Sequence, residues 1–472
     1  MLGVADLACA RVRVFNEDVT REQRLVLVIA ILASFAAFLD SSVVNVALPA
    51  ISRELGGGLA VQQWVVDAYL ITLGSLILLA GSLSDVFGRI VVLRVGLIGF
   101  GVASLLVAIS PNAELLIIMR GVQGIAAALL VPSSLALIVS SFRDAAQAKA
   151  IGTWTAWTSA AFLAGPLIGG LFVDFLTWRL VFAINLLPIL GALWLLAVLG
   201  QKDAREPGVR VDFLGAGLGV LGLGGPVFAL IEQGNLGWGS PAIYLPMALG
   251  LLCLAAFIWW EGRAKHPMLP LGIFANGNFA WGNIATFFIY GALSIGGFII
   301  VVFLQQVAGF AATIAALALL PVSLGNIFLS GLFGTLSGKY GPRLFMTIGP
   351  IIGGIGYLLL LLVGEHVNYW FDVLPGVLVF ALGISITVAP LTAAILGSIP
   401  ASQAGIGSAV NNAVARVAGL IAVAMLGVVI AGPLDVVSFH RVLIVTAALL
   451  FVGGIVSFVG IRNSSARAPL PS

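Results

Sequence analysis

Charged side chains are scarce in this chain of 472 residues, which holds 22 lysines and arginines and 19 aspartates and glutamates. They make up 9% of the sequence, whereas a soluble domain carries about 25%. So few charges cannot cover a soluble surface, which excludes a cytosolic enzyme, a nucleic-acid-binding protein and a disordered chain. Hydrophobic residues reach 61%, so the composition indicates a protein that crosses a membrane many times.

Cysteine and histidine are also rare. The two cysteines are Cys9 and Cys253, and the three histidines lie far apart, at His266, His366 and His440. These numbers exclude a disulfide scaffold and argue against a metal site. The sequence also lacks a nucleophile–base pair, a phosphate-binding loop and an ATP-binding motif, so we expect neither an enzyme nor a cofactor. An ion gradient is then the expected energy source.

Long apolar runs fill most of the chain. A helix that spans a bilayer needs about 20 mostly apolar residues, and an isolated run satisfies its backbone hydrogen bonds only as a helix. Fourteen such runs predict an all-α polytopic membrane protein. The predicted spans are 25–49, 63–83, 90–109, 114–140, 148–173, 178–199, 212–231, 241–260, 279–303, 311–333, 344–363, 371–396, 405–430 and 440–461.

Basic residues are distributed unevenly between the loops, and cytoplasmic loops of membrane proteins carry the excess of lysine and arginine. With a cytoplasmic N-terminus, seventeen of the 22 lie on that side, and Arg53, Arg179 and Arg441 lie outside. The remaining two, Arg120 and Arg416, fall within spans. We therefore expect both termini in the cytoplasm, in a plasma or inner membrane. The first 24 residues carry no cleavage site, so no removable signal peptide is expected.

Two loops repeat one pattern. GSLSDVFGR (81–89) follows the second span, GTLSGKYGPR (334–343) follows the tenth, and their identities align at one offset of 253 residues. Internal similarity of this kind is typical of transporters built from two related halves. The predicted domains are a cytoplasmic tail at 1–24, a six-helix bundle at 25–200, a linker with an inserted transmembrane hairpin at 201–278, a second six-helix bundle at 279–461 and a cytoplasmic tail at 462–472.

The first loop resembles the signature of the major facilitator superfamily, G-x-L-x-D-x-x-G-R-[KR], although Ile90 stands where a second basic residue is usual. Other segments resemble the fourteen-spanner drug:proton antiporters, the EmrB/QacA family. They are LDSSVVNVALP (39–49), RGVQG (120–124), AGPLIGG (164–170) and NNAVARVAG (411–419). The resemblance runs from residue 25 to 461 and implies the major facilitator fold.

Two ionisable residues within spans predict the site of ion coupling. An aspartate at the centre of a span costs about 2.5–3.5 kcal/mol, which a structural role rarely justifies, so Asp40 is a candidate proton carrier. Arg120 lies at a similar depth and is its expected partner, and the family resemblance assigns this arginine to proton coupling. The alternatives are an aspartate that bonds only helix neighbours such as Asn45, and an arginine that bonds backbone carbonyls.

Four further residues are candidates for contact with the transported molecule. Asp67 is expected at the outer mouth of a cavity, and some similar multidrug transporters carry an acid there that is associated with cationic drugs. The alternative is an interfacial acid hydrated from outside. In the thirteenth span, Asn411, Asn412 and Arg416 either line the cavity or tie helices together.

The resemblance assigns the first repeated loop to a conformational latch formed by Gly81, Asp85, Gly88 and Arg89. In that role the Asp85 carboxylate lies at the N-terminus of a helix of the other half, where the helix dipole favours an anion. A capping aspartate in an ordinary basic loop is the alternative.

The AGPLIGG segment carries small residues on one helix face, and small residues allow helices to approach closely. The resemblance implies that Gly165, Pro166, Gly169 and Gly170 form an antiporter motif, which brings the two halves together and limits leakage. Glycine-rich packing without that role is the alternative.

Taken with the resemblance, these features predict a proton-coupled transporter that exports amphipathic, cationic drugs or toxic compounds by alternating access. The alternatives are a transporter of the same fold that carries a lipid, a siderophore or a metabolite, and a non-transporting membrane sensor. The expected partners are a small-molecule substrate, protons and the lipid bilayer, with no nucleic acid and a monomeric chain.

Overall fold

The computed structural model describes residues 20–200, 211–400 and 403–463, except for the side chains of Asp85, Asp144 and Ala145. Within these ranges fourteen helices are long and apolar enough to cross a membrane, and no strand is present. The predicted all-α membrane fold is therefore confirmed. Most of the two predicted cytoplasmic tails lies outside the described residues, as does the polar linker at 201–210.

Most spans are single helices, and three are broken into two. The single helices are α2 (Arg21–Leu55), α3 (Gly58–Phe87), α4 (Arg89–Ala108), α5 (Ala113–Ser141), α6 (Asp144–Phe175), α9 (Phe213–Leu236), α10 (Pro241–Glu261), α11 (Gly277–Gln306), α14 (Pro342–Leu359), α15 (Leu374–Leu396) and α18 (Val436–Gly460). The broken spans are α7 (Leu180–Ala183) with α8 (Leu186–Leu199), α12 (Ala312–Leu317) with α13 (Leu320–Tyr340), and α16 (Ala404–Ala424) with α17 (Leu426–Ile430). Short turns of other helix types are η1 (Leu271–Ala275), η2 (Leu360–Leu362) and η3 (Tyr369–Val373).

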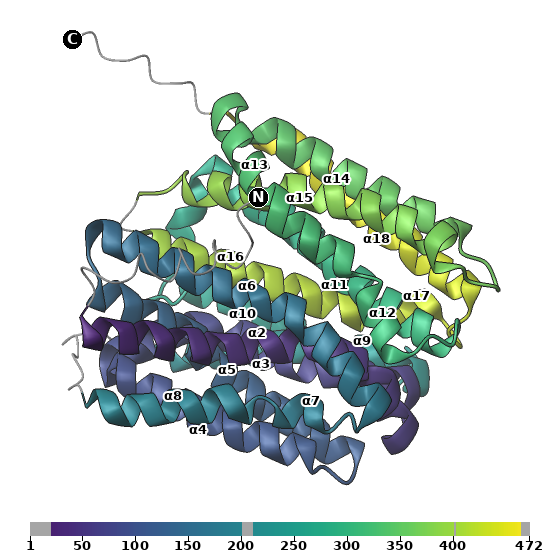
Figure 1. The fold of residues 1–472 in the computed structure, drawn as a ribbon, viewed down its shortest axis with the longest axis horizontal. Helices are drawn as coiled ribbons and strands as arrows, with labels where there is room; N and C mark the ends of the chain where they lie inside the picture. The colour runs from purple at the N-terminus through teal and green to yellow at the C-terminus, as the bar shows by residue number, and fades with distance from the viewer. Residues whose placement is uncertain (1–19, 201–210, 401–402, 464–472) are drawn as a thin grey trace, which may run out of the picture.

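Helices α2 to α8 pack together as a first group, drawn purple to teal in Figure 1. Helix α2 packs against α5, α6 and α8, while α5 also packs against α3 and α4. Lipid supplies no hydrophobic force between helices, so close packing and interhelical hydrogen bonds hold such a group together. One example is Thr72 Oγ1 on α3, which donates to the carbonyl oxygen of Gly121 on α5 at 2.8 Å.

Helices α11 to α18 form a second group, drawn green to yellow in Figure 1. Helix α11 packs against α16 and α18, and α14 packs against α15 and α18. Gly356 of α14 and Gly376 of α15 face each other so closely that a Cβ atom on either would lie within 2.8 Å of the other's carbonyl oxygen. The tight α14–α15 contact thus depends on glycine.

Helices α9 and α10 form a hairpin whose first helix packs at the seam between the two groups. Leu223, Val227 and Ile231 of α9 share an apolar cluster with Ile71 of α3 and Leu420 of α16. Helix α10 packs on the far side of α9, and only 11% of its most apolar stretch is buried. The hairpin therefore contacts both groups mainly through α9, and most of α10 is exposed.

The two repeated loops have the same backbone geometry. Gly88 has φ 99° and ψ 141°, and Gly341 has φ 87° and ψ 150°. Each donates its backbone N–H to a serine carbonyl four residues earlier, Ser84 at 3.0 Å and Ser337 at 2.8 Å. A positive φ favours glycine because it has no Cβ atom, so the aligned glycines of the two sequences make the same turn.

The two groups are joined at one end, which we call the outer end and define by Gly56, Leu176 and Ala311. There, the Asp174 carboxylate at the end of α6 accepts the backbone N–H groups of Ala312 and Thr313, at 2.9 and 2.8 Å. Toward the opposite, inner end, where α2 begins, α13 and α14 slant away from the first group in Figure 1. The inner half of α6 is exposed there, with Trp157 57% exposed.

Gln63 also joins the two groups of helices. Gln63 Nε2 on α3 donates to the carbonyl oxygens of Val423 and Ala424, at 2.7 and 3.1 Å. These carbonyls end α16 at its break from α17, where the helix leaves acceptors without an intrahelical partner. Gln63 therefore satisfies the broken helix and holds it against the first group.

We predict that the hairpin depends on Gly225, where an added Cβ atom would overlap the carbonyl oxygen of Pro246 and lie 3.1 Å from Gly250 Cα. Overpacking of a close contact costs about 1–3 kcal/mol, so Gly225→Leu should lower the melting temperature of the purified protein. Gly217→Leu, on the same helix but facing open space, is the matched control. Equal melting temperatures for the two variants would contradict the prediction.

Candidate functional site

Asp40 lies in the middle of α2 and is fully buried, at 0% exposure. Its Oδ2 accepts Arg120 Nη1 of α5 at 2.6 Å. Its Oδ1 accepts Gln123 Nε2 and Asn185 Nδ2, both at 2.9 Å. Three donors from two other spans therefore surround this carboxylate. Their hydrogen bonds replace those to water that a charged group loses when it is buried.

Arg120 is 2% exposed and is held on several sides. Its Nη1 also donates to Gln123 Oε1 at 2.7 Å, and its Nε donates to the Val65 carbonyl oxygen at 2.9 Å. The guanidinium carbon lies 4.4 Å from the centroid of the Tyr69 ring, within the range of a cation–π contact. The predicted partnership of Arg120 with Asp40 is therefore present.

The alternative in which Asp40 bonds only neighbours on its own helix, such as Asn45, is wrong, because its three donors lie on α5 and at the α7–α8 break. Sequence reasoning missed two of these donors, Gln123 and Asn185. Both are amide side chains inside apolar spans, at RGVQG and FAINLLP, and a polar amide inside a span is the signal that points to them.

A central cavity of about 450 Å³ lies beside this cluster. Its walls come from both groups of helices, with Arg120 on one side and Arg416 on the other. Among the side chains that the structure describes, no aspartate or glutamate lines it. The polar or aromatic residues that line it are Phe38, Ser41, Asn45, Tyr69, Arg120, Phe162, Tyr290, Ser294, Phe298, Asn412 and Arg416. The volume falls in the range of about 300–1,000 Å³ that is typical of small-molecule sites.

The three candidates on α16 divide between the two predicted alternatives. Asn412 and Arg416 line the cavity, one helical turn apart. Asn411 points elsewhere: its Nδ2 donates to Thr286 Oγ1 at 2.9 Å and to Asn283 Oδ1 at 3.2 Å, both on α11. Asn411 therefore ties two helices, because adjacent residues of a helix point in different directions.

The expectation that Asp67 lies at a hydrated outer mouth is wrong. Asp67 is 0% exposed and is absent from the lining of the central cavity. Neither of its carboxylate oxygens has a hydrogen-bond partner within the described part of the chain. It shares a face of α3 with Gln63, which bonds α16, and with Gly74, which packs against Arg416 Cβ and Val417. Asp67 thus lies between α3 and α16, and its assignment to substrate binding stays a prediction.

The glycines of the predicted antiporter motif face two different helices. A Cβ atom on Gly165 would overlap Ser42 Oγ, and one on Gly169 would lie 2.6 Å from Val43 Cγ2, so both pack against α2 of their own group. A Cβ atom on Gly170 would lie 2.5 Å from Thr313 Cα of α12. Only Gly170 of these three therefore meets the other half, which corrects the expected contact for Gly165 and Gly169. Pro166 lies inside α6 without ending it.

The predicted latch is described only in part, because the Asp85 side chain lies outside the described residues. Gly88 makes the turn that ends α3, and Arg89 begins α4. Gly81 is exposed, and a Cβ atom there would meet nothing within 4 Å. In this conformation, then, none of the described helices packs closely on Gly81.

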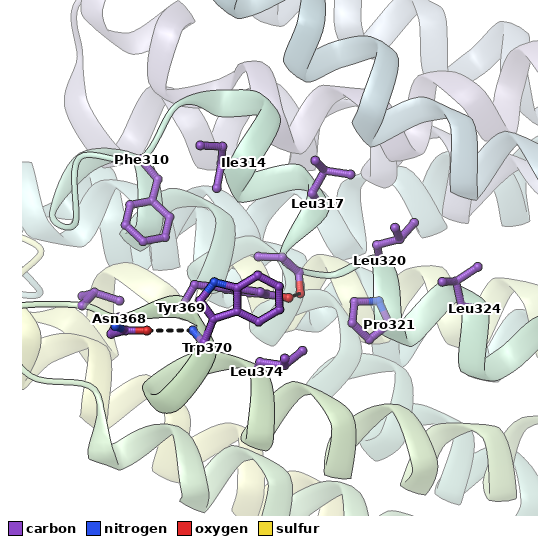
Figure 2. A pocket seen from close by; sticks show the side chains of 12 residues that line it. Phe310, Ile314, Leu317, Leu320, Pro321, Leu324, Asn368, Tyr369, Trp370 and Leu374 are labelled. Atoms are coloured by element: carbon purple, nitrogen blue, oxygen red, sulfur yellow. Dashed lines mark hydrogen bonds between the residues drawn. The ribbon is translucent and has the colours of Figure 1, made fainter.

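A second hollow of about 710 Å³ lies near the outer end of the second group (Figure 2). Apolar side chains of α12, α13 and the start of α15 line it, and Trp370, which is 69% exposed, lies across it. Asn368 Oδ1 accepts the Trp370 backbone N–H at 3.0 Å. The described residues that line this hollow are uncharged and all belong to the second half, unlike the lining of the central cavity.

No group of three or more histidine, cysteine, aspartate or glutamate side chains within the described ranges is arranged to hold a metal ion. The chemistry available at the central cavity is therefore that of a buried ion pair, amides, hydroxyls and aromatic rings.

Known proteins are similar to this chain in sequence and in fold. The sequence profile of the Major Facilitator Superfamily matches residues 30–423. The methylenomycin A resistance protein of Bacillus subtilis (strain 168) is 36% identical over 410 residues, which cover 86% of this chain and 87% of the relative. The multidrug resistance protein Stp of Mycobacterium tuberculosis (strain CDC 1551 / Oshkosh) is 34% identical over 418 residues, 87% of this chain and 76% of the relative. The puromycin resistance protein pur8 of Streptomyces alboniger is 33% identical over 419 residues, 86% and 81%.

Solved structures share the arrangement of helices at much lower identity. The peptide transporter POT in complex with sulfate has a TM-score of 0.68 at 15% identity, over 93% of this chain and 94% of that chain. The inward-open xylose transporter XylE from E. coli has a TM-score of 0.64 at 15% identity, over 93% and 97%. With a sequence match over most of its length and this common arrangement of helices, the chain belongs to the Major Facilitator Superfamily.

Proposed function

We propose that this protein exports amphipathic compounds across a cell membrane by alternating access, in exchange for protons. The observation that carries the proposal is the fully buried Asp40–Arg120 pair beside a cavity that both groups of helices line. The relatives that cover most of the chain are described as resistance and multidrug resistance proteins, which supports export.

In this proposal the two six-helix bundles, 25–200 and 279–461, rock against each other around the central cavity. The outer end faces the outside of a plasma or inner membrane, both termini are cytoplasmic, and a single chain suffices because its own two halves line the cavity. The closed outer seam and the separated inner ends then correspond to the state that loads cargo from the cytoplasm.

The Asp40 cluster supplies a mechanism for coupling. Asp40 of α2 holds Arg120 of α5 and Asn185 at the α7–α8 break through one carboxylate. Breaking a buried ion pair from one side costs about 3–5 kcal/mol, which is enough to change the packing of three spans. A proton that reaches Asp40 removes its charge, and we propose that the resulting loss of the ion pair permits the change between the two states.

The first prediction of this proposal concerns Asp40→Asn. The amide is almost isosteric but carries neither the charge nor the exchangeable carboxyl proton, so uphill efflux driven by a pH gradient should fall to the level of empty liposomes. Fluorescence of a dansyl-labelled compound released from proteoliposomes measures it. Glu114→Gln, an acid-to-amide change at an exposed position on α5, is the control. Undiminished uphill efflux by Asp40→Asn would exclude Asp40 as the proton carrier.

A second prediction concerns the outer seam. Gly170→Leu places a side chain against the backbone of Thr313, so the outer ends should separate and transport should stop. Gly152→Leu, on the same helix with open space at its Cβ position, should transport as the unmodified protein does. Labelling of a cysteine introduced at Thr313 by a membrane-impermeant maleimide reports the opening. Unchanged labelling with normal transport would rule out a role for this contact in closure.

A third prediction concerns Asp67. Because neither carboxylate oxygen has a hydrogen-bond partner, Asp67→Asn should not lower the melting temperature. The carboxyl lies between helices of different halves and away from the cavity, so its loss should slow transport of anionic, neutral and cationic compounds by one common factor. A loss confined to cationic compounds would instead assign Asp67 to substrate recognition.

A further inference from the structure

The central cavity carries an unbalanced positive charge. Of the residues that the structure describes, two arginines line it, Arg120 and Arg416, and no acidic side chain does. The charge of Arg120 is matched by Asp40 at 2.6 Å. The charge of Arg416 is not matched, because this side chain makes no hydrogen bond or ion pair with any other described residue.

The two acids nearest in sequence to the cavity walls do not supply the missing charge. Asp40 is fully buried behind Arg120, and its oxygens already accept three donors. Asp67 is fully buried outside the cavity. A guanidinium group without a partner at membrane depth is costly, and such groups usually pair with an opposite charge or face a water-filled cavity.

The surroundings of Arg416 suit an anion. Asn412 lies one helical turn away on the same wall, and Tyr290 and Ser294 of α11 line the cavity with it. Amide and hydroxyl groups donate hydrogen bonds without adding negative charge. An arginine fork with neutral donors is a common way to bind a carboxylate, sulfonate or phosphate group.

The remainder of the cavity suits an apolar body. Phe38 of α2 and Phe162 of α6 both line it, with ring centroids 5.3 Å apart. Leu293 and Phe298 of α11 add further apolar surface. A molecule with an anionic group at Arg416 and an aromatic or aliphatic body against these rings would satisfy both parts.

We propose that the cargo is an amphipathic anion whose charged group binds Arg416. This inference rests on the proposed export function and names its substrate class. It reverses the expectation, drawn from the acid at Asp67, that the cargo is cationic, because that acid does not reach the cavity.

Three dansyl compounds on one fluorophore test the charge preference: dansylglycine is an anion, dansylglycinamide is neutral and dansylcadaverine is a cation. The full-length protein in phosphatidylcholine vesicles, which contain no competing anionic lipid, should transport dansylglycine faster than the other two. Arg416→Gln should lower the dansylglycine rate about tenfold or more, the range expected for loss of a charged hydrogen bond. Dansylglycinamide transport should change much less.

Two further variants separate recognition from folding. Arg416→Glu should invert the preference toward dansylcadaverine. Arg441→Gln, an exposed arginine outside the cavity, should leave all three rates unchanged. The melting temperature of each purified variant identifies any that fail to fold.

The possible results distinguish this inference from the proposed function. Equal losses of dansylglycine and dansylglycinamide transport in Arg416→Gln would make Arg416 a structural residue and overturn the inference. Transport of dansylcadaverine or dansylglycinamide but not dansylglycine by the unmodified protein would also overturn it, while export itself would stand. Transport of none of the three would count against the proposed function and the inference with it.

Discussion

The cost of holding a charge inside a bilayer organises the first half of this protein. An aspartate or arginine at the centre of a span costs a few kcal/mol, and a buried ion pair compensates only when hydrogen bonds satisfy both partners. Asp40 and Arg120 meet that requirement through Gln123, Asn185 and a backbone carbonyl. Since these groups come from four spans, the pair also sets how α2, α3, α5 and the α7–α8 break lie relative to one another.

Around this pair, the helices approach through small residues and a few polar ties. Gly165 and Gly169 bring α6 onto α2, and Gly356 and Gly376 bring α14 onto α15. Between the halves, apolar clusters are supplemented by polar contacts, with Asp174 at the start of α12 and Gln63 at the broken end of α16. The two hydrogen-bonded contacts lie toward the outer end, which leaves the inner ends separated, as the proposed alternating access requires.

The two halves share the backbone turn in their repeated loops but differ in where their charged residues lie. Gly88 and Gly341 make the same turn, yet the acid of the first loop, Asp85, is matched by Gly338 in the second. The buried ion pair belongs to the first half, while Arg416 of the second half faces a cavity whose described lining holds no acid. In the proposed mechanism, the first half then carries ion coupling and Arg416 of the second half binds the charged group of the cargo, while both halves line the cavity.

Length and hydropathy in the sequence determined the fourteen spans, because a helix that crosses a bilayer needs a long apolar run whatever its neighbours are. The sequence also identified Asp40, Arg120 and Arg416 as candidates, because each is an ionisable residue inside an apolar run and the cost of burying its charge does not depend on distant residues. Tertiary structure decided which way each side chain faces. It separated Asn411 from Asn412, directed Gly165 to one helix and Gly170 to another, and buried Asp67 away from the cavity. Most spans are apolar on all sides, so their hydropathy does not indicate which face meets which helix, and only packing fixes it.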